Sequence, residues 1–310
     1  MQETKEFYGH GKLLLTGEYF VLDGATALAA PTRQGQRFRV RPMLQDSRYD
    51  LIWRMHVPGQ SQASTFSFTS EDWSHTHLSD DPIRSRLQQL FYAAEQLRPR
   101  CTVQLLGQEV DTELEFPTDW GLGSSSTLVW FLARFLEINA YDLLRLSFNG
   151  SGYDVACAGV DGPIMYQRRD SDPIIKPVHF RPDWAASSCF VHRNKKQNSR
   201  EGIAKYREAA AAAGAKDRIS GISKALLDKT SDLRAAASLL EEHEQLIGET
   251  LGLSPVKDLL FADFDGTVKS LGAWGGDFVW VLSERPATWV RDYFNERGYP
   301  TVIAYNDMLL

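Results

Sequence analysis

The sequence predicts an α+β protein built from two halves. A chain of 310 residues is long for a single hydrophobic core and short for three domains. In its first half, several stretches alternate apolar and polar residues with the two-residue period of β-strands. Past residue 180 the pattern changes to longer segments with the 3.6-residue period of helices. We therefore expect a first half rich in strands and a second half rich in helices.

The first half contains one strongly periodic helix among short strands. Apolar residues recur on one face of residues 82–97, at the spacing of an amphipathic helix. A more apolar helix is expected after Pro117 and a glycine- and serine-rich turn, ending near Glu137. Alternating segments and short apolar runs predict strands at residues 11–16, 36–43, 49–57, 64–69, 101–106 and 112–116.

The second half shows helix caps. A helix is expected at residues 231–251, because Gly252 follows its last apolar residue and glycine commonly ends helices. Another helix is expected to begin with Ser254 as N-cap and Pro255 at the first helical position, and to stop at Gly266. The other predicted helices cover residues 200–213 and 286–297, and strands are predicted at residues 268–271, 278–282 and 301–305.

The composition excludes several classes of function. The formal net charge is −6, from 34 basic and 40 acidic residues without a run of five like charges, so no nucleic-acid partner is expected. Three cysteines lie far apart and outside any CxxC spacing, which predicts neither disulfides nor a zinc site. No basic-then-apolar leader and no apolar stretch of membrane-spanning length is present. We expect a cytoplasmic protein with no membrane partner.

The segment DFDGT, residues 263–267, resembles the aspartyl nucleophile loop of haloacid-dehalogenase phosphatases. Those enzymes also need a lysine and an acidic pair from later strands of one sheet, but no Asp-Asp pair follows Asp265. Apolar residues at helical spacing before the segment instead place Asp263 and Asp265 in the last turn of a helix that Gly266 ends. Phosphatase chemistry is therefore not expected.

The strongest functional signal is the segment PTDWGLGSSSTLVWFLARFL, residues 117–136. Two glycines, three serines and an apolar helix form a loop whose backbone N–H groups can converge on a phosphate at the positive end of the helix. Gly121 and Gly123 allow close approach, and one of the serines could bind Mg²⁺. The alternative is a loop that only caps a core helix. The spacing matches neither the P-loop pattern GxxxxGK[ST] nor GxGxxG.

Two further segments place a charged residue next to flexible glycines. In NGSGYDVACAG, residues 149–159, Asp154 stands at the start of a small-residue helix, where a carboxylate stays ionised and can accept a hydroxyl proton. The alternative is a plain N-cap aspartate. In GHGKLLLTGEYFVLDG, residues 9–24, Lys12 precedes a buried-looking strand, so its ammonium group is expected at the rim of the sheet. Taken alone, Lys12 gives no indication of a function.

Together these segments resemble the three signature motifs of the GHMP kinases, the superfamily of galactokinase, homoserine kinase, mevalonate kinase and phosphomevalonate kinase. Lys12 and GEYFVLDG match the first motif, PTDWGLGSSS the second, and GAWGGD at residues 272–277 the glycine turn of the third. The likeness runs from about residue 9 to about residue 283. GSGYDVACAG is similar to a segment of phosphomevalonate kinases, which indicates the mevalonate-pathway branch and a subgroup with a Gly-Tyr-Asp-Ile/Val-Ala signature.

The resemblance implies the GHMP kinase fold. This fold has an N-terminal half like domain 2 of ribosomal protein S5 and a C-terminal, ferredoxin-like half with added helices. The implied domains are residues 1–180 and 181–310, with the active site in the cleft between them. The resemblance also implies ATP and Mg²⁺ as cofactors and a small-molecule substrate, and it is compatible with a homodimer.

The resemblance further assigns roles to residues. Lys12 and Asp154 match the lysine and aspartate that face the acceptor hydroxyl, where Lys12 would stabilise the transferring oxygens and Asp154 would take the proton. Ser125 is the candidate Mg²⁺ ligand. The implied nucleotide-binding residues are Gly121, Leu122, Gly123, Ser124, Ser125 and Ser126. The implied substrate-binding residues are Glu18, Tyr19, Ser151, Gly152, Lys195, Gly272, Gly275 and Gly276.

Several features depart from the family pattern. Leu143 stands where mevalonate kinases carry a metal-binding glutamate, which puts the Mg²⁺ ligand set in doubt. The connection from Ser126 to Asp154 is short for the helix that family members insert. Trp274 replaces a glycine of the third motif, and Leu271 replaces its usual Ser or Thr. A bulky indole there would narrow the acceptor pocket or keep the backbone away from a phosphate.

The predicted function is ATP-dependent phosphorylation of an alcohol or phosphate acceptor, with phosphomevalonate favoured over mevalonate. Two alternatives stay open: a catalytically silent GHMP-fold protein that binds a metabolite, and an ATP-dependent decarboxylase like diphosphomevalonate decarboxylase. Lys195 and Lys196 either meet an anionic group of the substrate or form a solvated loop. No catalytic role is assigned to His10, expected in a solvent-facing turn, to His243, expected on a helix face, or to His192.

Overall fold

The chain folds into two compact units, each assembled from several segments. The computed structural model describes residues 4–43, 47–73, 79–170, 172–195, 199–209, 211–229, 232–272, 274 and 276–310. The N-terminal unit consists of Met1–Gly11, Gln34–Thr118 and Gly123–Gly159, and the C-terminal unit of Lys12–Arg33, Asp119–Leu122 and Val160–Leu310. The long strands β1 (Lys5–Leu14) and β2 (Ala27–Pro42) belong to both units. A domain boundary between residues 180 and 181 stays a prediction.

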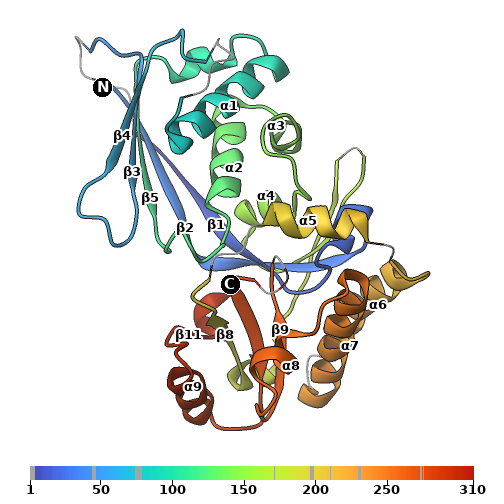
Figure 1. The fold of residues 1–310 in the computed structure, drawn as a ribbon. Helices are drawn as coiled ribbons and strands as arrows, with labels where there is room; N and C mark the ends of the chain where they lie inside the picture. Colours follow the sequence, from blue (N-terminus) through green and yellow to red (C-terminus); the bar gives the residue numbers. More distant parts are fainter. Residues whose placement is uncertain are drawn as a thin grey trace. The chain divides into compact units, whose positions relative to one another are not determined.

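The N-terminal unit is a mixed sheet with helices on one face. Its strands lie in the order β4-β3-β5-β2, and β3 pairs parallel with β5 whereas the other pairs in this row are antiparallel. Helices α1, α2 and α3 lie along one side of the sheet (Figure 1). Aromatic rings fill the core, with Phe38 and Phe131 stacked at a centroid distance of 4.3 Å. The elements are β3 (Leu51–His56), β4 (Ser64–Phe68), β5 (Gln108–Leu114), α1 (Pro82–Leu97), α2 (Ser124–Leu136), α3 (Ala140–Ser147) and α4 (Tyr153–Ala158).

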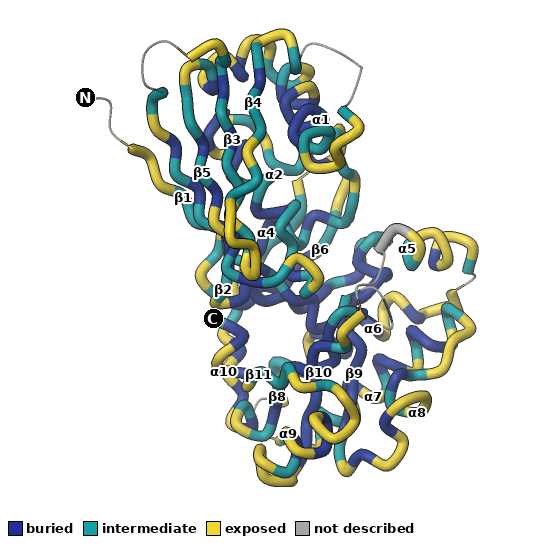
Figure 2. The backbone as a smooth tube through the Cα atoms, turned by 60° about the vertical axis from the view of Figure 1, so that its left-hand side comes forward, coloured by how far each residue is buried: buried dark blue, intermediate teal, exposed yellow. Residues whose placement is uncertain are grey.

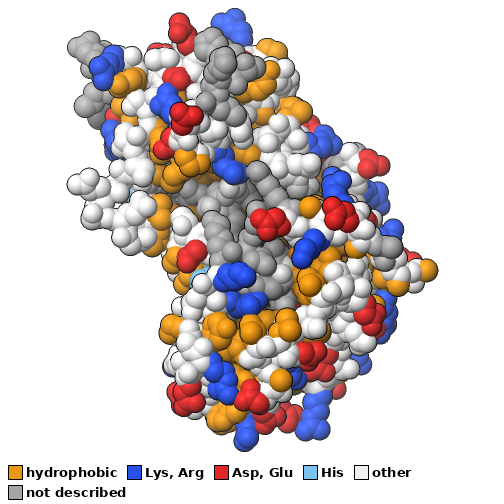
Figure 3. Space-filling view, in the orientation of Figure 1, with side chains coloured by type: hydrophobic (Ala, Val, Ile, Leu, Met, Phe, Trp, Pro, Cys, Tyr) orange, Lys and Arg blue, Asp and Glu red, His pale blue; other side chains and the backbone are white. Residues whose placement is uncertain are grey.

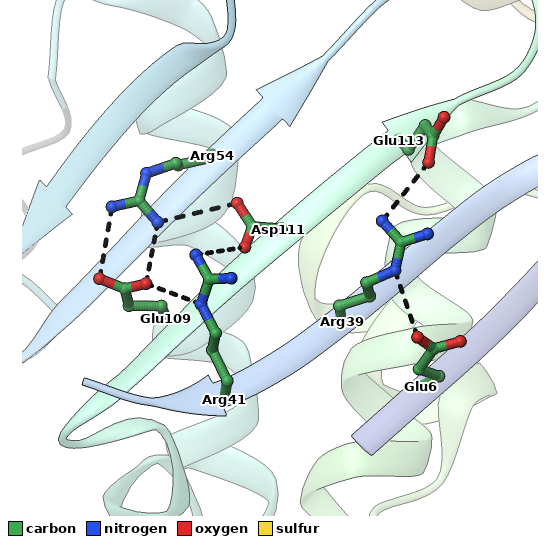
Figure 4. Close-up of polar contacts among 7 residues, drawn as sticks. All are labelled: Glu6, Arg39, Arg41, Arg54, Glu109, Asp111 and Glu113. Carbon is green, nitrogen blue, oxygen red and sulfur yellow. Dashed lines mark hydrogen bonds and ion pairs between the residues drawn. The ribbon is translucent and has the colours of Figure 1, made fainter. Parts of the chain in front are cut away.

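The opposite face of this sheet carries a ladder of paired charges (Figure 4). Phe38 and Val40 of β2 are buried in the core, so the alternating residues Arg39 and Arg41 project from the other face. Their guanidinium groups contact acidic side chains of neighbouring strands. The pKa of Glu109 is lowered, mainly by the hydrogen bond that its carboxylate accepts from Arg54. The pairs are Glu6–Arg39, Arg39–Glu113, Arg41–Glu109, Arg41–Asp111, Arg54–Glu109 and Arg54–Asp111, at N···O distances of 2.9–3.7 Å. Each of the three arginines therefore pairs with two carboxylates.

The C-terminal unit contains an antiparallel sheet in the order β11-β8-β10-β9. Every residue of β10 is buried (Figure 2). The start of β2 pairs with β6, and β6 pairs with β7, so this unit also includes part of the larger sheet. The strands are β6 (Ile164–Gln167), β7 (Ile174–Pro177), β8 (Ser188–His192), β9 (Thr267–Ser270), β10 (Phe278–Leu282) and β11 (Val302–Ala304). The helices are α5 (Ser199–Glu208), α6 (Ala215–Asp228), α7 (Leu233–Leu251), α8 (Val256–Leu260), α9 (Ala287–Glu296) and α10 (Tyr305–Met308).

The surface shows no segregation of charge on the face drawn in Figure 3, where basic and acidic side chains are interspersed. Among the residues that the structure describes, no helix combines the length and apolar character that crossing a bilayer requires.

Several predicted elements are confirmed. The helix at residues 82–97 has the expected bounds, because Asp81 caps it by accepting the N–H groups of Ile83 and Arg84 and Pro82 starts it. The strand at residues 278–282 also has the expected bounds. Helix α7 ends where Gly252 adopts a left-handed φ of 64°.

The predicted strand at residues 101–106 is wrong, since Cys101–Leu105 forms a 3₁₀ helix. The carboxylate of Glu95, at the end of α1, accepts the backbone N–H groups of Arg100 and Thr102. Arg100 adopts a left-handed φ of 68°, which turns the chain back onto α1. These local contacts, together with the burial of Cys101, outweigh the strand preference of the apolar residues.

The predicted helix at residues 254–266 ends early, at Leu260, and the helix predicted to reach residue 213 ends at Glu208. After Leu260 the chain leaves the helix and buries Phe261 and Phe264 against Phe294 of α9. Asp263 and Asp265 therefore lie in turns, not in a last helical turn. Their carboxylates pair with arginines: Arg297 contacts Asp263 at 2.6 Å and Arg285 contacts Asp265 at 2.8 Å. This pairing accounts for both aspartates of DFDGT without phosphatase chemistry.

Candidate active site

The serine loop is the turn that starts α2. Gly123 has a left-handed φ of 92° and serves as the N-cap, and its carbonyl accepts the N–H groups of Ser126 at 2.9 Å and Thr127 at 3.1 Å. Ser124 and Ser125 are half-buried in the first turn of the helix, whereas Ser126 is buried. The first N–H groups of a helix have no partner within the helix, so this end attracts an anion.

Asp154 is hydrogen-bonded to the serine loop. The Ser126 hydroxyl donates to Oδ2 of Asp154 at 2.8 Å, and the N–H of Val155 donates to Oδ1 at 3.0 Å. The predicted small-residue helix is α4, but its N-cap is Gly152, with a φ of 88°, so the alternative of a plain N-cap aspartate is wrong. Ser151 precedes this glycine and is half-buried. The carboxylate is thus held at the first turns of both α2 and α4.

Lys12 is hydrogen-bonded to the other end of the same loop. It lies on β1, half-buried, and its ammonium donates to the carbonyl of Gly121 at 2.7 Å. Its backbone N–H donates to the carbonyl of Leu122 at 3.0 Å. Gly121, at the start of the segment 121–126, therefore accepts a hydrogen bond from Lys12. Ser126, at its end, donates one to Asp154.

Asp277 packs against the first glycine of the loop, and sequence reasoning did not single it out. Gly121 has a left-handed φ of 65°, and a Cβ atom at this position would lie 1.8 Å from Oδ2 of Asp277. Only glycine leaves room for the carboxylate there. The signal in the sequence was the aspartate that follows the glycine run GAWGG.

Replacing Gly121 with alanine is expected to lower the free energy of unfolding by roughly 1–3 kcal/mol. The alanine backbone would be strained at the left-handed φ, and its Cβ would push the Asp277 carboxylate aside. Urea denaturation followed by circular dichroism measures the loss. Gly107→Ala is the matched control, since Gly107 has a φ of 70° with no atom within 4 Å of the added Cβ. Equal losses in the two variants would show that Asp277 does not restrict this position.

The third motif lies between β9 and β10, and the structure describes Gly272, Trp274, Gly276 and Asp277 of it. The N–H of Leu271 donates to the carbonyl of Phe278 at 3.1 Å and closes the turn, and Gly272 adopts a left-handed φ of 73°. Gly276 is buried, and Gly275 lies outside the described residues. Trp274 is only 7% exposed and packs in an apolar cluster with Tyr19 and other residues of the C-terminal unit. Its indole is therefore a core side chain.

Glu18 belongs to a cluster of buried charges. The resemblance implies substrate contacts for Glu18 and Tyr19, yet the structure buries both side chains. Nζ of Lys269 donates to Oε1 of Glu18 at 2.5 Å, and His243 and Glu244 of α7 lie beside this pair. Burial raises the pKa of Glu18, against the attraction of Lys269, and burial lowers the pKa of His243 well below its ordinary value. His243 is thus inside the protein and neutral.

The remaining candidates are Lys195, Lys196 and the two histidines His10 and His192. Lys195 is exposed, and Lys196 lies outside the described residues. His10 is on strand β1 instead of the expected solvent-facing turn, and its ring contacts Tyr8. His192 is buried, with its Nε2 atom 3.3 Å from the carbonyl oxygen of Asp119.

The side chains near the serine loop offer Mg²⁺ only a few protein ligands. Leu143 is fully buried in α3, which lies in the short connection from Ser126 to Asp154 that was predicted to leave less room for a helix. Among the described residues no three metal-binding side chains form a cluster. Mg²⁺ commonly binds through one or two carboxylates, phosphate oxygens and water. The hydroxyl of Ser125 and the carboxylate of Asp154 are compatible with such a site.

Known proteins resemble this chain in structure only. Neither the protein-family models nor the curated proteins include a match. A Lin0012 protein from Listeria innocua matches with a TM-score of 0.71 at 16% identity, over 97% of each chain. Lactococcus lactis galactokinase complexed with galactose matches with a TM-score of 0.69 at 14% identity, over 98% of this chain and 94% of that chain. Streptococcus pneumoniae phosphomevalonate kinase in complex with phosphomevalonate and AMPPNP matches with a TM-score of 0.66 at 17% identity, over 96% of each chain.

At such identities the likeness establishes the fold. The predicted α+β class is confirmed: the chain has the fold of the GHMP kinases, with a mixed N-terminal sheet and an antiparallel C-terminal sheet, over nearly its whole length.

Proposed function

We propose that this chain is an ATP-dependent kinase of the GHMP superfamily that phosphorylates a small alcohol or phosphate acceptor, with phosphomevalonate favoured and mevalonate second. The observation that carries the proposal is the pair of hydrogen bonds made to the loop 121–126: Lys12 to Gly121, and Ser126 to Asp154. The fold shared with sugar and mevalonate-pathway kinases supports it. A cytoplasmic location and a homodimer stay predictions.

In the proposed mechanism the loop 121–126 binds the phosphates of ATP. Its backbone N–H groups lie at the start of α2, where negative charge is favoured. The acceptor oxygen attacks the γ-phosphorus, the new O–P bond forms as the bond to the β-phosphate oxygen breaks, and ADP leaves. Phosphoryl transfer of this kind needs alignment and charge neutralisation more than covalent help.

In this proposal Lys12 acts on the transferring phosphoryl group, and Asp154 acts on the acceptor. The ammonium of Lys12 would neutralise charge on the transferring oxygens. The carboxylate of Asp154 would orient the acceptor oxygen and, with an alcohol acceptor, take the hydroxyl proton late in the transfer. The hydrogen bond from Ser126 fixes the direction of this carboxylate. Mg²⁺, held by Ser125 together with the phosphates, would supply positive charge to the triphosphate.

A catalytically silent relative is the second candidate. The observation that favours it is Leu143, which is fully buried at the position where mevalonate kinases carry a metal-binding glutamate. Retention of Lys12, Asp154 and the serine loop favours the kinase instead.

Coupled ADP-release assays with ATP, Mg²⁺ and a panel of acceptors test the proposal. We expect acceptor-dependent ADP formation and a phosphorylated product with phosphomevalonate or mevalonate. No acceptor-dependent turnover with any alcohol or phosphate on the panel, combined with retained ATP binding, would indicate the silent relative. Release of carbon dioxide from diphosphomevalonate would instead identify a decarboxylase.

A further inference from the structure

A buried hydroxyl connects the first turn of α2 to strand β2. It belongs to Thr127, which donates to Oε1 of Gln36 at 2.6 Å and lies 2.9 Å from the carbonyl oxygen of Ser124. Thr127 is fully buried, and Gln36 is 5% exposed. Apart from Ser126, the other buried side chains of α2 are apolar. The contact between Thr127 and Gln36 is therefore a polar link from helix to sheet inside the N-terminal unit.

Two glycines let α2 pack directly on neighbouring backbone. A Cβ atom on Gly9 of β1 would lie 3.1 Å from Cβ of Thr127 and 3.2 Å from the ring of Trp130. A Cβ atom on Gly159, the C-cap of α4, would lie 2.5 Å from Nε1 of Trp130. Because close-packed side chains resist displacement, these contacts leave the start of α2 little room to shift.

The same turn carries the contact to the candidate base. Ser126 directly precedes Thr127 and donates its hydroxyl to Oδ2 of Asp154 at 2.8 Å. Successive side chains of an α-helix point about 100° apart, so the two hydroxyls face different neighbours but move together when the turn rotates. A change that frees the Thr127 hydroxyl therefore also changes the direction of the Ser126 hydroxyl.

Helix packing alone does not require Gln36. A threonine in a helix commonly donates to the carbonyl three or four residues earlier, and the Ser124 carbonyl offers such a partner here. Burying the amide of Gln36 as well costs free energy, which its hydrogen bond offsets. A satisfied polar pair in an apolar core favours one arrangement of the packed elements.

We propose that Gln36 and Thr127 are positioning residues for phosphoryl transfer. Their hydrogen bond fixes the first turn of α2 against β2, and this turn holds the Ser126 hydroxyl in the direction that orients the Asp154 carboxylate. Both side chains are buried, so they act through Ser126 and not on the substrate. The effect on the reaction rests on the proposed function, whereas the fixing of the turn does not.

Amide hydrogen exchange of the full chain, followed by nuclear magnetic resonance, tests the fixing of the turn. The N–H groups of Ser126 and Thr127 donate to the N-cap carbonyl at 2.9 and 3.1 Å. Gln36→Leu removes the link to β2 but leaves Thr127 the Ser124 carbonyl as a partner. Exchange at these two N–H groups is expected to become about tenfold faster, because the first turn opens more often. Residues 131–136 of α2 should exchange as before. Unchanged exchange at Ser126 and Thr127 would overturn the proposal.

Steady-state kinetics test the effect on the reaction, with mevalonate or phosphomevalonate, whichever the original protein phosphorylates. Thr127→Val combined with Gln36→Leu is expected to lower kcat about tenfold, with KM for ATP within about threefold. Since both polar partners are removed together, the urea midpoint should stay close to that of the original protein. Thr127→Ser keeps the hydroxyl and should keep kcat within about threefold.

Thr112→Val is the matched control for losing a buried threonine. Thr112 lies on β5 in the same unit, and its hydroxyl has no hydrogen-bond partner among the described residues. We expect its kcat and its exchange rates to equal those of the original protein. An equal loss of kcat in Thr112→Val and in the double variant would show that the loss does not come from the hydrogen bond.

The Asp154→Asn background decides whether the effect passes through Asp154. There the double variant is expected to lower kcat by less than about twofold, because a carboxylate that is already absent cannot be misdirected. An equally large loss in both backgrounds, or an unchanged kcat in the folded double variant, would refute the positioning role. Should the original protein phosphorylate no acceptor, the proposed function fails, and hydrogen exchange still decides whether the pair fixes the turn.

Discussion

With an alcohol acceptor such as mevalonate, Asp154→Asn is expected to lower kcat by about 10²–10⁴-fold, because the amide cannot take the proton of the acceptor hydroxyl. The substitution keeps the shape of the side chain and an oxygen that can accept the 2.8 Å hydrogen bond from Ser126. Stability and ATP affinity should therefore change little, and the effect should fall on the chemical step. ADP-release kinetics with the accepted substrate, together with ATP titration by calorimetry, measure both quantities.

Asp142→Asn is the matched control for this experiment. Asp142 lies on α3 and pairs with Arg145 at the surface, a kind of interaction that contributes little. We expect its kcat to equal that of the original protein. A kcat for Asp154→Asn within a few fold of the original value would exclude Asp154 as the base.

Lys269→Met is expected to lower the free energy of unfolding by about 3–5 kcal/mol. Lys269 is fully buried, and the Glu18 carboxyl that it contacts at 2.5 Å is 1% exposed. Without the ammonium, a buried charge has no compensating partner. Burial already raises the pKa of Glu18, so the variant should lose more stability at pH 8 than at pH 5, where the carboxyl can be protonated.

Urea denaturation at both pH values measures this loss, and two further variants define its cause. Glu18→Gln combined with Lys269→Met should recover part of the stability, because the unpaired carboxylate is gone. Lys257→Met is the control for losing a lysine, since Lys257 lies 3.8 Å from Glu241 in a partly exposed pair. A double variant less stable than Lys269→Met would contradict the ion-pair explanation.

The elements that the sequence predicted well are those with local signals. Asp81 and Pro82 mark the start of α1, and Gly252 marks the end of α7, because caps and left-handed glycines act within one turn of chain. The serine loop was likewise visible, since two glycines before a run of serines and an apolar helix have few structural uses. Helices α3 and α6 were missed: α3 spans only 8 residues, and α6 begins after Gly214 without a side-chain cap.

The errors arose where contacts other than the apolar periodicity decided the outcome. The helix after Pro255 stops at Leu260 because Phe261 and Phe264 find partners on α9, more than 20 residues later in the chain. Glu95 converts a predicted strand into a 3₁₀ helix by accepting two backbone N–H groups. Neither contact follows from the period of apolar residues.

Local sequence patterns were enough to predict the fold class, the position of the serine loop and the helix that carries Asp154. Turns, caps and periodicity depend on residues that are neighbours in the chain. Only the tertiary structure decided which groups meet. It pairs Glu18 with Lys269, attaches Trp274 to Glu244 and packs Asp277 against Gly121. Such contacts join residues far apart in the chain, and their energies depend on burial, which no local pattern specifies.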